Sequence, residues 1–91
     1  MPFVTTAEVW VPEREQVVFR FIVPAKGDRW TFCVSRLVLE ELVGSEVNDP
    51  VTGFQQFRPQ IYLAAQRRMK WADPKRQQGL DADEIMNAGA P

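Results

Sequence analysis

The chain has 91 residues, of which 45% are hydrophobic and 25% charged, and this length and composition are typical of one globular domain. A single cysteine and the absence of histidine exclude an internal disulfide and the usual zinc sites, and they remove the side chain best suited to acid–base catalysis. The net charge of −1 conceals a positive block, because residues 52–80 hold six basic residues and one acid, while 1–51 and 81–91 each have a net charge of −3. We therefore expect one domain, 1–91, that is not an enzyme and holds no metal or cofactor.

The first half of the chain predicts a three-stranded antiparallel sheet with strand order 1-2-3. Hydrophobic side chains alternate along 17–23 and 30–34, and the turn-forming residues of 24–29 join these two segments into a hairpin. Upstream, 7–11 alternates in the same way until Pro12 stops it, which is typical of an edge strand. Because a hairpin alone is marginally stable, its aromatic face needs a cover of helices.

Two main helices are expected to pack on one face of this sheet, which gives an α+β fold. Ser35 is a good N-cap for the first helix, and Gly44 ends it after a leucine-rich segment. An Asp-Pro pair at 49–50 predicts the start of a second, amphipathic helix that runs to about Ala72. Pro59 removes one backbone hydrogen bond inside this helix, so the helix either kinks or restarts there.

The remaining residues are expected to lie outside the core, which spans about 5–72. The segment 73–91 predicts a turn, a short helical segment and a flexible tail. Asp81 is a candidate N-cap of the short helix, with Glu84 behind it at the spacing of a capping box. Nothing in the sequence predicts a linker long enough to divide the chain into two domains.

Several of these segments occur together in a known order. They are the strand VVFRF, the segment FCVS that leads into the helix RLVLEEL, and GLDADE near the C-terminus, with further matching positions in the second helix at Phe54, Phe57, Arg58, Ile61 and Ala65. Over roughly residues 15–85 the chain resembles a small bacterial family, domain of unknown function 1488. The resemblance implies a curled antiparallel sheet against helices and a bacterial cytoplasmic origin, and it implies no activity. The chain departs from the pattern at Pro59 and in the basic segment before Gly79.

The segment AAQRRMKWADPKRQ has two interpretations. Its cations and its tryptophan are suited to contacting phosphates and stacking on a base. Alternatively, it is the solvated end of a helix, where the helix dipole favours cations. The second interpretation is favoured because the sequence pI of about 5.4 lies far below the pI above about 9 that is usual for strong nucleic-acid binders. The candidate contact residues are Arg67, Lys70, Trp71, Lys75 and Arg76.

Arg68 and Cys33 are the other chemically distinctive residues. Arg68 projects into the apolar face of the second helix, so we expect an ion pair with an acid of the first helix, such as Glu41, rather than an anionic ligand. Cys33 lies two residues before a helix N-cap, a position that could lower its pKa. Because no histidine can serve as its base, we interpret Cys33 as a buried core residue.

The location of the protein follows from features that the sequence lacks. No window approaches the roughly 18 consecutive apolar residues of a membrane span. The N-terminal segment has neither a basic leader nor an unbroken apolar run, so we expect no signal peptide. Together with the single cysteine, these features predict a cytoplasmic protein without membrane contact.

The face of the sheet opposite the helices is the second candidate surface. If the phenylalanines of the sheet face the helices, then Trp10, Val18 and Ile22 lie on the other side of the sheet with Cys33. An apolar patch on so small a chain usually marks a partner, unless the sheet curls to cover itself. We therefore predict a non-enzymatic interaction or accessory protein that binds an unidentified protein or a second copy. Weak nucleic-acid binding is the alternative.

Overall fold

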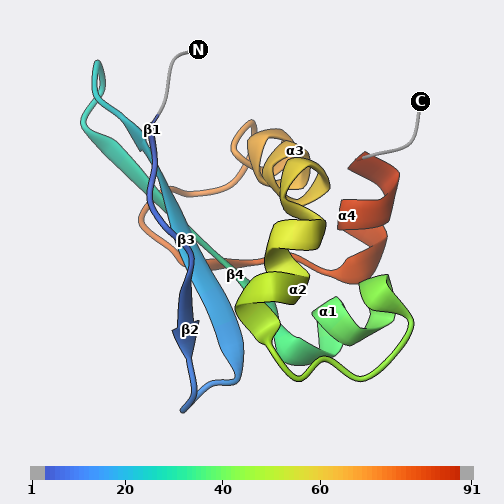
Figure 1. Cartoon of the computed structure of the whole chain (residues 1–91). Coiled ribbons are helices and arrows are strands. Elements are labelled where there is room, and N and C mark those ends of the chain that lie inside the picture. The colour runs from blue at the N-terminus through green and yellow to red at the C-terminus, as the bar shows by residue number, and fades with distance from the viewer. Residues whose placement is uncertain (1–3, 89–91) are drawn as a thin grey trace.

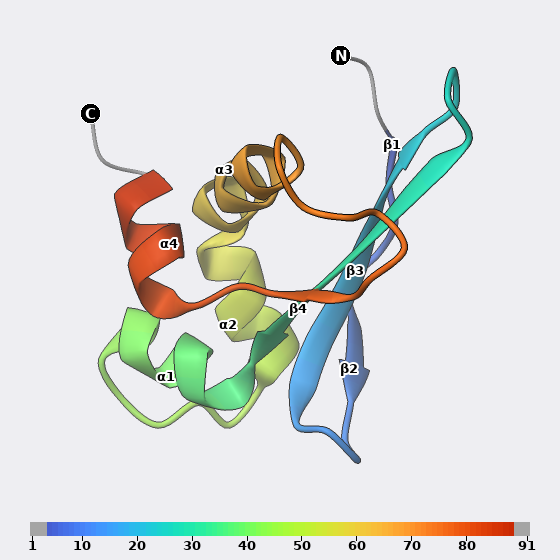
Figure 2. The same ribbon diagram turned by 180° about the vertical axis from the view of Figure 1, so that it is seen from behind.

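The computed structural model describes residues 4–88, which form a sheet of five strands with four helices on one side (Figure 1 and Figure 2). The strands are β1 (Val4–Thr5), β2 (Val9–Val11), β3 (Gln16–Val23), β4 (Asp28–Ser35) and β5 (Gln78–Gly79). The helices are α1 (Arg36–Val43), α2 (Pro50–Gln56), α3 (Arg58–Arg68) and α4 (Ala82–Ala88). The predicted α+β class and the packing of the helices on one face are confirmed.

The hairpin of β3 and β4 forms the centre of the sheet, with antiparallel pairing from Gln16–Ser35 to Val23–Asp28. Both β1 and β2 pair antiparallel with the other edge of β3, so the predicted order of the first three segments is confirmed. The prediction of three strands and a purely antiparallel sheet was wrong, because β5 pairs in parallel with β4 and β1 adds a further short strand. Each of these strands has two residues, which is too short for an alternating pattern to reveal.

An aromatic cluster on the helix-facing side of β3 and β4 forms the core. Phe19 is fully buried, and its ring centroid lies 5.6 Å from that of Phe32 and 5.3 Å from those of Phe54 and Tyr62. Phe54 belongs to α2 and Tyr62 to α3, so this cluster joins both helices to the hairpin. Such aromatic pairs add stability beyond the area that they bury.

Pro59 restarts the helix rather than kinking it. The backbone leaves the helical conformation at Phe57, with φ −111° and ψ 14°, and α3 begins at Arg58. Pro59 therefore occupies the first turn of α3, where a missing N–H group costs no hydrogen bond. The predicted end of this helix at Ala72 was wrong, because α3 ends at Arg68 and turns follow it.

The predicted helix caps are present. The Ser35 hydroxyl accepts a hydrogen bond from the Val38 N–H group at 3.2 Å, and Gly44 ends α1 with φ 82°, a conformation that favours glycine. The Asp49 carboxylate caps α2 by accepting hydrogen bonds from the hydroxyl and the N–H group of Thr52, and these bonds lower the pKa of Asp49. Each cap satisfies a backbone N–H group that has no partner within its helix.

The core extends beyond residue 72, the end that the sequence predicts. Leu80, Ile85 and Ala88 are each at most 4% exposed, because α4 packs against α1 and α3. The Asp81 carboxylate caps α4 by accepting a hydrogen bond from the Glu84 N–H group at 2.8 Å, as predicted. The predicted flexible tail at 89–91 lies outside the described residues.

Arg68 attaches α4 to the rest of the fold. Its Nε donates to a Glu84 carboxylate oxygen at 3.0 Å, its Nη2 contacts the other oxygen, and further bonds reach the Gln78 side chain and the Gly79 carbonyl. The expected ion pair is therefore present, but its partner is Glu84 of α4 rather than an acid of the first helix such as Glu41. The reason is that α4 folds back beside α3.

We predict that Glu84→Gln lowers the free energy of unfolding by about 2 kcal/mol, because it leaves the largely buried Arg68 guanidinium without its counter-charge. Asp83→Asn is the matched control, since Asp83 is exposed and has no ion pair among residues 4–88. Urea unfolding of both variants would measure the difference. Equal midpoints would show that the ion pair contributes nothing to the attachment of α4.

Candidate functional site

The strand side chains that point away from the helices form a surface that we call the outer face. Residues paired across neighbouring strands point to the same side, so the register assigns Val9 with Val18, and Val4 with Ile22, to this face. Both views place the helices on the opposite side of the sheet (Figure 1 and Figure 2). Val4 and Val9 are each 56% exposed, which leaves aliphatic surface uncovered.

A shallow hollow of about 260 Å³ lies on the outer face, and we call it the outer groove. Its floor is made of aliphatic strand residues, and polar or basic side chains surround them. The lining residues are Val9, Val11, Arg14, Gln16, Val18, Arg20 and Gln77. The segment between α3 and β5 contributes Gln77, so part of the chain far from β3 in sequence reaches the rim of the groove.

The charged side chains that line the outer groove are all positive. Arg14 and Arg20 are its charged lining residues, and neither forms an ion pair within the described part of the chain. Arg29, which is paired with Ile22 across the hairpin, adds a third exposed cation to the outer face. Three arginines of the helical side differ, because each contacts at least one glutamate: Arg36, Arg58 and Arg68.

The structure places two of the three residues of the predicted protein interface on the outer face. Val18 and Ile22 lie there, both partly buried. The prediction for Trp10 was wrong. Trp10 pairs with the fully buried Val17 and packs against the core, so it lies on the helix-facing side of the sheet. Alternation along β2 separates Val9 from Trp10, but only the pairing with β3 decides which of them faces the helices.

The sequence reasoning missed the cationic residues of the outer groove. Arg20 interrupts an otherwise hydrophobic strand at an outward position, and that position was a signal that could have identified it. Arg14 lies in the turn between β2 and β3, where no periodic pattern predicts the direction of a side chain. Both residues became recognisable as part of one surface once the register of the hairpin was known.

The five candidate nucleic-acid contacts lie on the last turn of α3 and the segment after it. Arg67 donates to the Asn87 carbonyl at 3.4 Å, and Trp71 is 72% exposed. The guanidinium of Arg68 lies 5.0 Å from the centroid of the Trp71 ring, so it occupies one face of that ring. The other three candidates, all exposed, are Lys70, Lys75 and Arg76.

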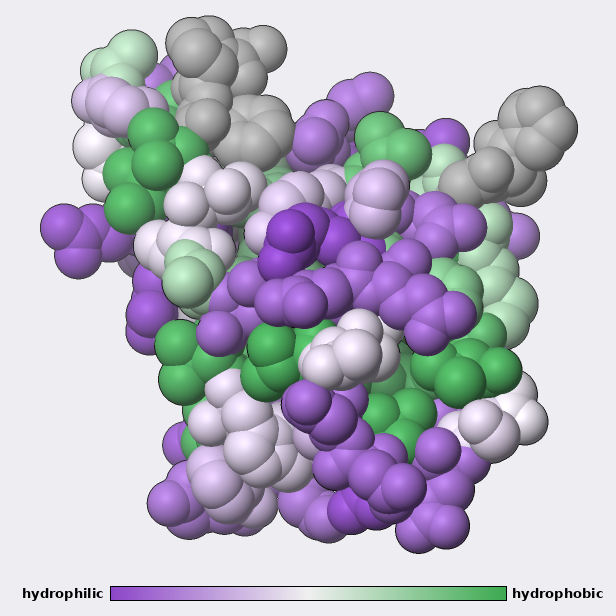
Figure 3. All heavy atoms as spheres, viewed as in Figure 1, coloured by the Kyte–Doolittle hydropathy of each residue, from purple (hydrophilic) through white to green (hydrophobic). Residues whose placement is uncertain are grey.

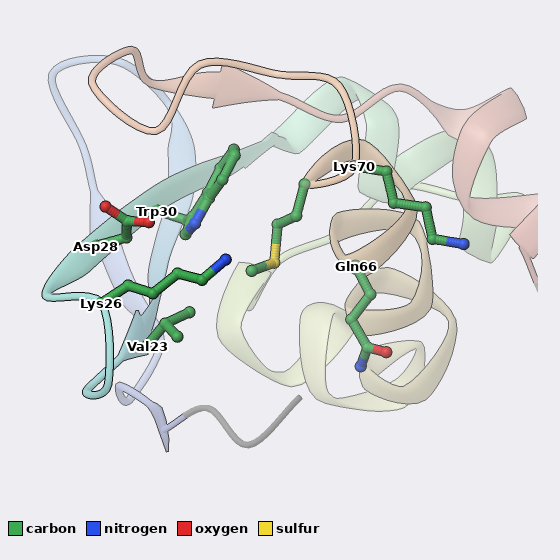
Figure 4. Close-up of a pocket in the computed structure, with 7 residues that line it drawn as sticks. Val23, Lys26, Asp28, Trp30, Gln66 and Lys70 are labelled. Carbon is green, nitrogen blue, oxygen red and sulfur yellow. The ribbon is translucent and has the colours of Figure 1, made fainter.

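A second hollow, of about 310 Å³, separates the tip of the hairpin from the end of α3 (Figure 4). Trp30 and Val23 form the wall on the sheet side, and Gln66 and Lys70 come from the helix side. The Lys70 side chain points away from Lys26, so the two ammonium groups do not converge on one ligand (Figure 4). Where Figure 3 shows the surface of the molecule, hydrophobic patches are small and separated by hydrophilic side chains.

Among residues 4–88, no group of three or more cysteine and carboxylate side chains is placed to hold a metal ion. Cys33 is 9% exposed and lies on the outer side of β4, where its Sγ faces Gly79 of β5. Within the same residues, no helix combines the length and hydrophobicity needed to cross a membrane.

The comparisons with known proteins identify the fold. No family model matches the chain, and no curated protein matches it significantly. A crystal structure of a protein of unknown function from the DUF1488 family of Shewanella loihica PV-4 is similar, with a TM-score of 0.74 and 19% sequence identity. The similarity covers 87% of this chain and 91% of that protein. The chain has a DUF1488-like fold. The resemblance seen in the sequence is thus confirmed for the fold, and nothing about activity follows from it.

A charged cluster lies where the residue before β2 meets α3. The Glu8 side chain is 8% exposed and forms an ion pair with Arg58, whose guanidinium also donates a hydrogen bond to it through Nε. Burial raises the pKa of Tyr62, and the negative charge of Glu8 raises it further, while Arg58 and a hydrogen bond with Thr5 oppose the shift. Fifty positions separate Glu8 from Arg58, so sequence spacing gave no sign of this pair.

We predict that the stability of the protein falls as the pH rises above about 10, because the native state holds the Tyr62 proton more tightly than the unfolded chain does. The contribution of Tyr62 to the free energy of unfolding is fully present below the pKa that Tyr62 has in the unfolded chain. It is lost as the pH rises through the raised pKa of the native state. Tyr62→Phe should remove this part of the pH dependence in urea unfolding. The single tyrosine of the chain also allows direct titration by absorbance, and a midpoint at or below its ordinary value would contradict the prediction.

Proposed function

We propose that this protein is a non-enzymatic interaction module of the bacterial cytoplasm, and that it binds a partner protein through the outer face of its sheet. The observation that carries the proposal is the uncovered aliphatic surface of that face, where Val4 and Val9 are each 56% exposed. Exposed apolar surface next to charged side chains is typical of a protein contact site. The DUF1488-like fold is compatible with this function but does not specify it.

Two features of the outer groove support binding rather than catalysis or self-association. Its lining residues include no carboxylate, thiol or hydroxyl group that could act as a general base or nucleophile. Face-to-face pairing of two copies would bring the guanidinium groups of Arg14, Arg20 and Arg29 on one positive surface toward those of another. A different protein is therefore the better partner, and a homodimer is the weaker variant of the proposal.

We predict that Val9→Asp abolishes capture of the partner, because it places an unpaired carboxylate in aliphatic surface that must be desolvated on binding. Leu37→Asp is the matched control, since Leu37 is 72% exposed and lies on α1, on the helical side. Proteins retained by the wild type and by the control, but not by Val9→Asp, would be identified by mass spectrometry. Reconstitution with the purified partner should then show at least about tenfold weaker binding for Val9→Asp. Equal binding by all three proteins would refute the use of the outer face.

The second candidate function is nucleic-acid binding at the end of α3. The observation that favours it is the exposure of Trp71, at 72%, beside the exposed cations Lys70, Lys75 and Arg76. The guanidinium of Arg68 already covers one face of the tryptophan ring, so at most one base can stack there. This arrangement supports weak binding only.

Fluorescence anisotropy of labelled single-stranded RNA and DNA would measure this activity. If the end of α3 binds nucleic acid, micromolar affinity should fall steeply with salt and be lost in Arg67→Ala/Lys70→Ala, because phosphate contacts release counterions. Trp71→Ala should weaken binding about tenfold through lost stacking. Flat titrations at low salt would remove this candidate and leave the segment as a solvated helix end.

A further inference from the structure

We propose that the segment that occupies the outer groove is acidic, an extended stretch of a partner protein in which carboxylate and aliphatic side chains alternate. This inference rests on the proposed function and specifies the chemistry of the partner at the same surface. It follows from three properties of the groove: cations that form no ion pair among residues 4–88, the spacing of its strand positions and the absence of aromatic side chains from its lining.

The first property is the cost of covering the cations. A partner that excludes water from Val9 and Val18 also removes water from the neighbouring guanidinium groups of Arg14 and Arg20. Neither guanidinium has a carboxylate partner among residues 4–88, so this chain does not offset their desolvation. A partner that covers the valines must therefore bring acids of its own. A neutral aliphatic segment would leave two buried cations without counter-charges.

The second property is the spacing of the groove residues. Gln16, Val18 and Arg20 are successive outward positions of β3, roughly 7 Å apart along the strand. Side chains on one face of an extended peptide repeat at the same interval. An extended segment can thus present an aliphatic side chain to Val18 and a carboxylate to Arg20 without leaving the strand conformation. A second carboxylate of the segment can pair with Arg14 at the border of the groove.

The third property separates a protein segment from a nucleic acid. Phosphates would also pair with Arg14 and Arg20, but a single strand gains much of its affinity from bases stacked on aromatic side chains. The aromatic residues of β2, β3 and β4 all lie on the helix-facing side of the sheet: Trp10, Phe19, Phe21, Trp30 and Phe32. The outward positions of the same strands carry aliphatic and polar residues, which suit the side chains of a peptide.

Selection of short random peptides displayed on phage against the immobilised full chain would test this inference. We expect enrichment of peptides in which two or more acids alternate with aliphatic residues. Synthetic copies should bind at least about tenfold more weakly to Arg14→Glu/Arg20→Glu, whose charges repel them. Binding to Arg67→Glu should change little, because Arg67 is exposed on the helical side. Arg14→Ala/Arg20→Ala, which removes the charges without reversing them, should give an intermediate loss.

The alternatives give different results. Enriched peptides that are neutral or basic, and that still require Val9, would overturn the acidic partner while leaving the proposed function intact. A screen in which no peptide depends on Val9 would overturn both. Single-stranded RNA that binds the wild type and loses affinity in Arg14→Ala/Arg20→Ala would assign the groove to nucleic acid instead. If the molecular mass in solution doubles with concentration for the wild type but not for Val9→Asp, the groove would be assigned to a second copy of the chain.

Discussion

The packing of Phe19 against both sheet and helices is the contact on which the rest of the structure depends. Phe19 meets Phe32 across the hairpin, Phe54 of α2 and Tyr62 of α3, so one side chain connects the hairpin with two helices that follow it far along the chain. A two-stranded hairpin is marginal alone, and short helices are marginal alone, so neither is stable until they share this apolar face. Because the helices must gather on that side, the opposite side of a one-layer sheet stays uncovered. The candidate site is a consequence of how the core is closed.

The distribution of ion pairs follows the same division between the two sides. On the helical side, Arg58 and Arg68 connect α3 to the residue before β2 and to α4, and each contacts a glutamate whose side chain is largely buried. These pairs hold the two ends of α3, which would fray if the helix were isolated. On the outer face, Arg14, Arg20 and Arg29 contact no acid within the described residues, so they contribute nothing comparable to the fold. Their charge remains available to a partner.

The sequence predicts the parts of the fold that depend on local patterns. Alternation in 17–23 assigned the buried face of the hairpin, and the caps at Ser35 and Asp49 assigned two helix starts. Contacts between distant segments were not accessible in the same way. The pairing of Trp10 with Val17 depends on a register that no single strand contains.

The attachment of the C-terminal segment was missed for the same reason. The ion pair of Arg68 with Glu84, and the two-residue strand β5, depend on the chain returning to β4 after a turn without regular pattern. The candidate site was therefore half predictable: Val18 and Ile22 follow from alternation, whereas Val9, Arg14 and Arg20 become one surface only when strands and turn are assembled.

Arg20 connects the behaviour of the strand that it interrupts with the chemistry of the partner that we propose. The strand QVVFRFIV is hydrophobic enough to pair with strands of other molecules, and an outward charge in its middle opposes that association. The same guanidinium lies in the wall of the outer groove, without a carboxylate partner among residues 4–88. A cation that opposes association of this strand would thereby also favour an acidic segment over a neutral apolar one in the proposed groove, because an acid offsets its desolvation. On this proposal, a single outward residue opposes unwanted strand pairing and contributes to the choice of a partner by charge.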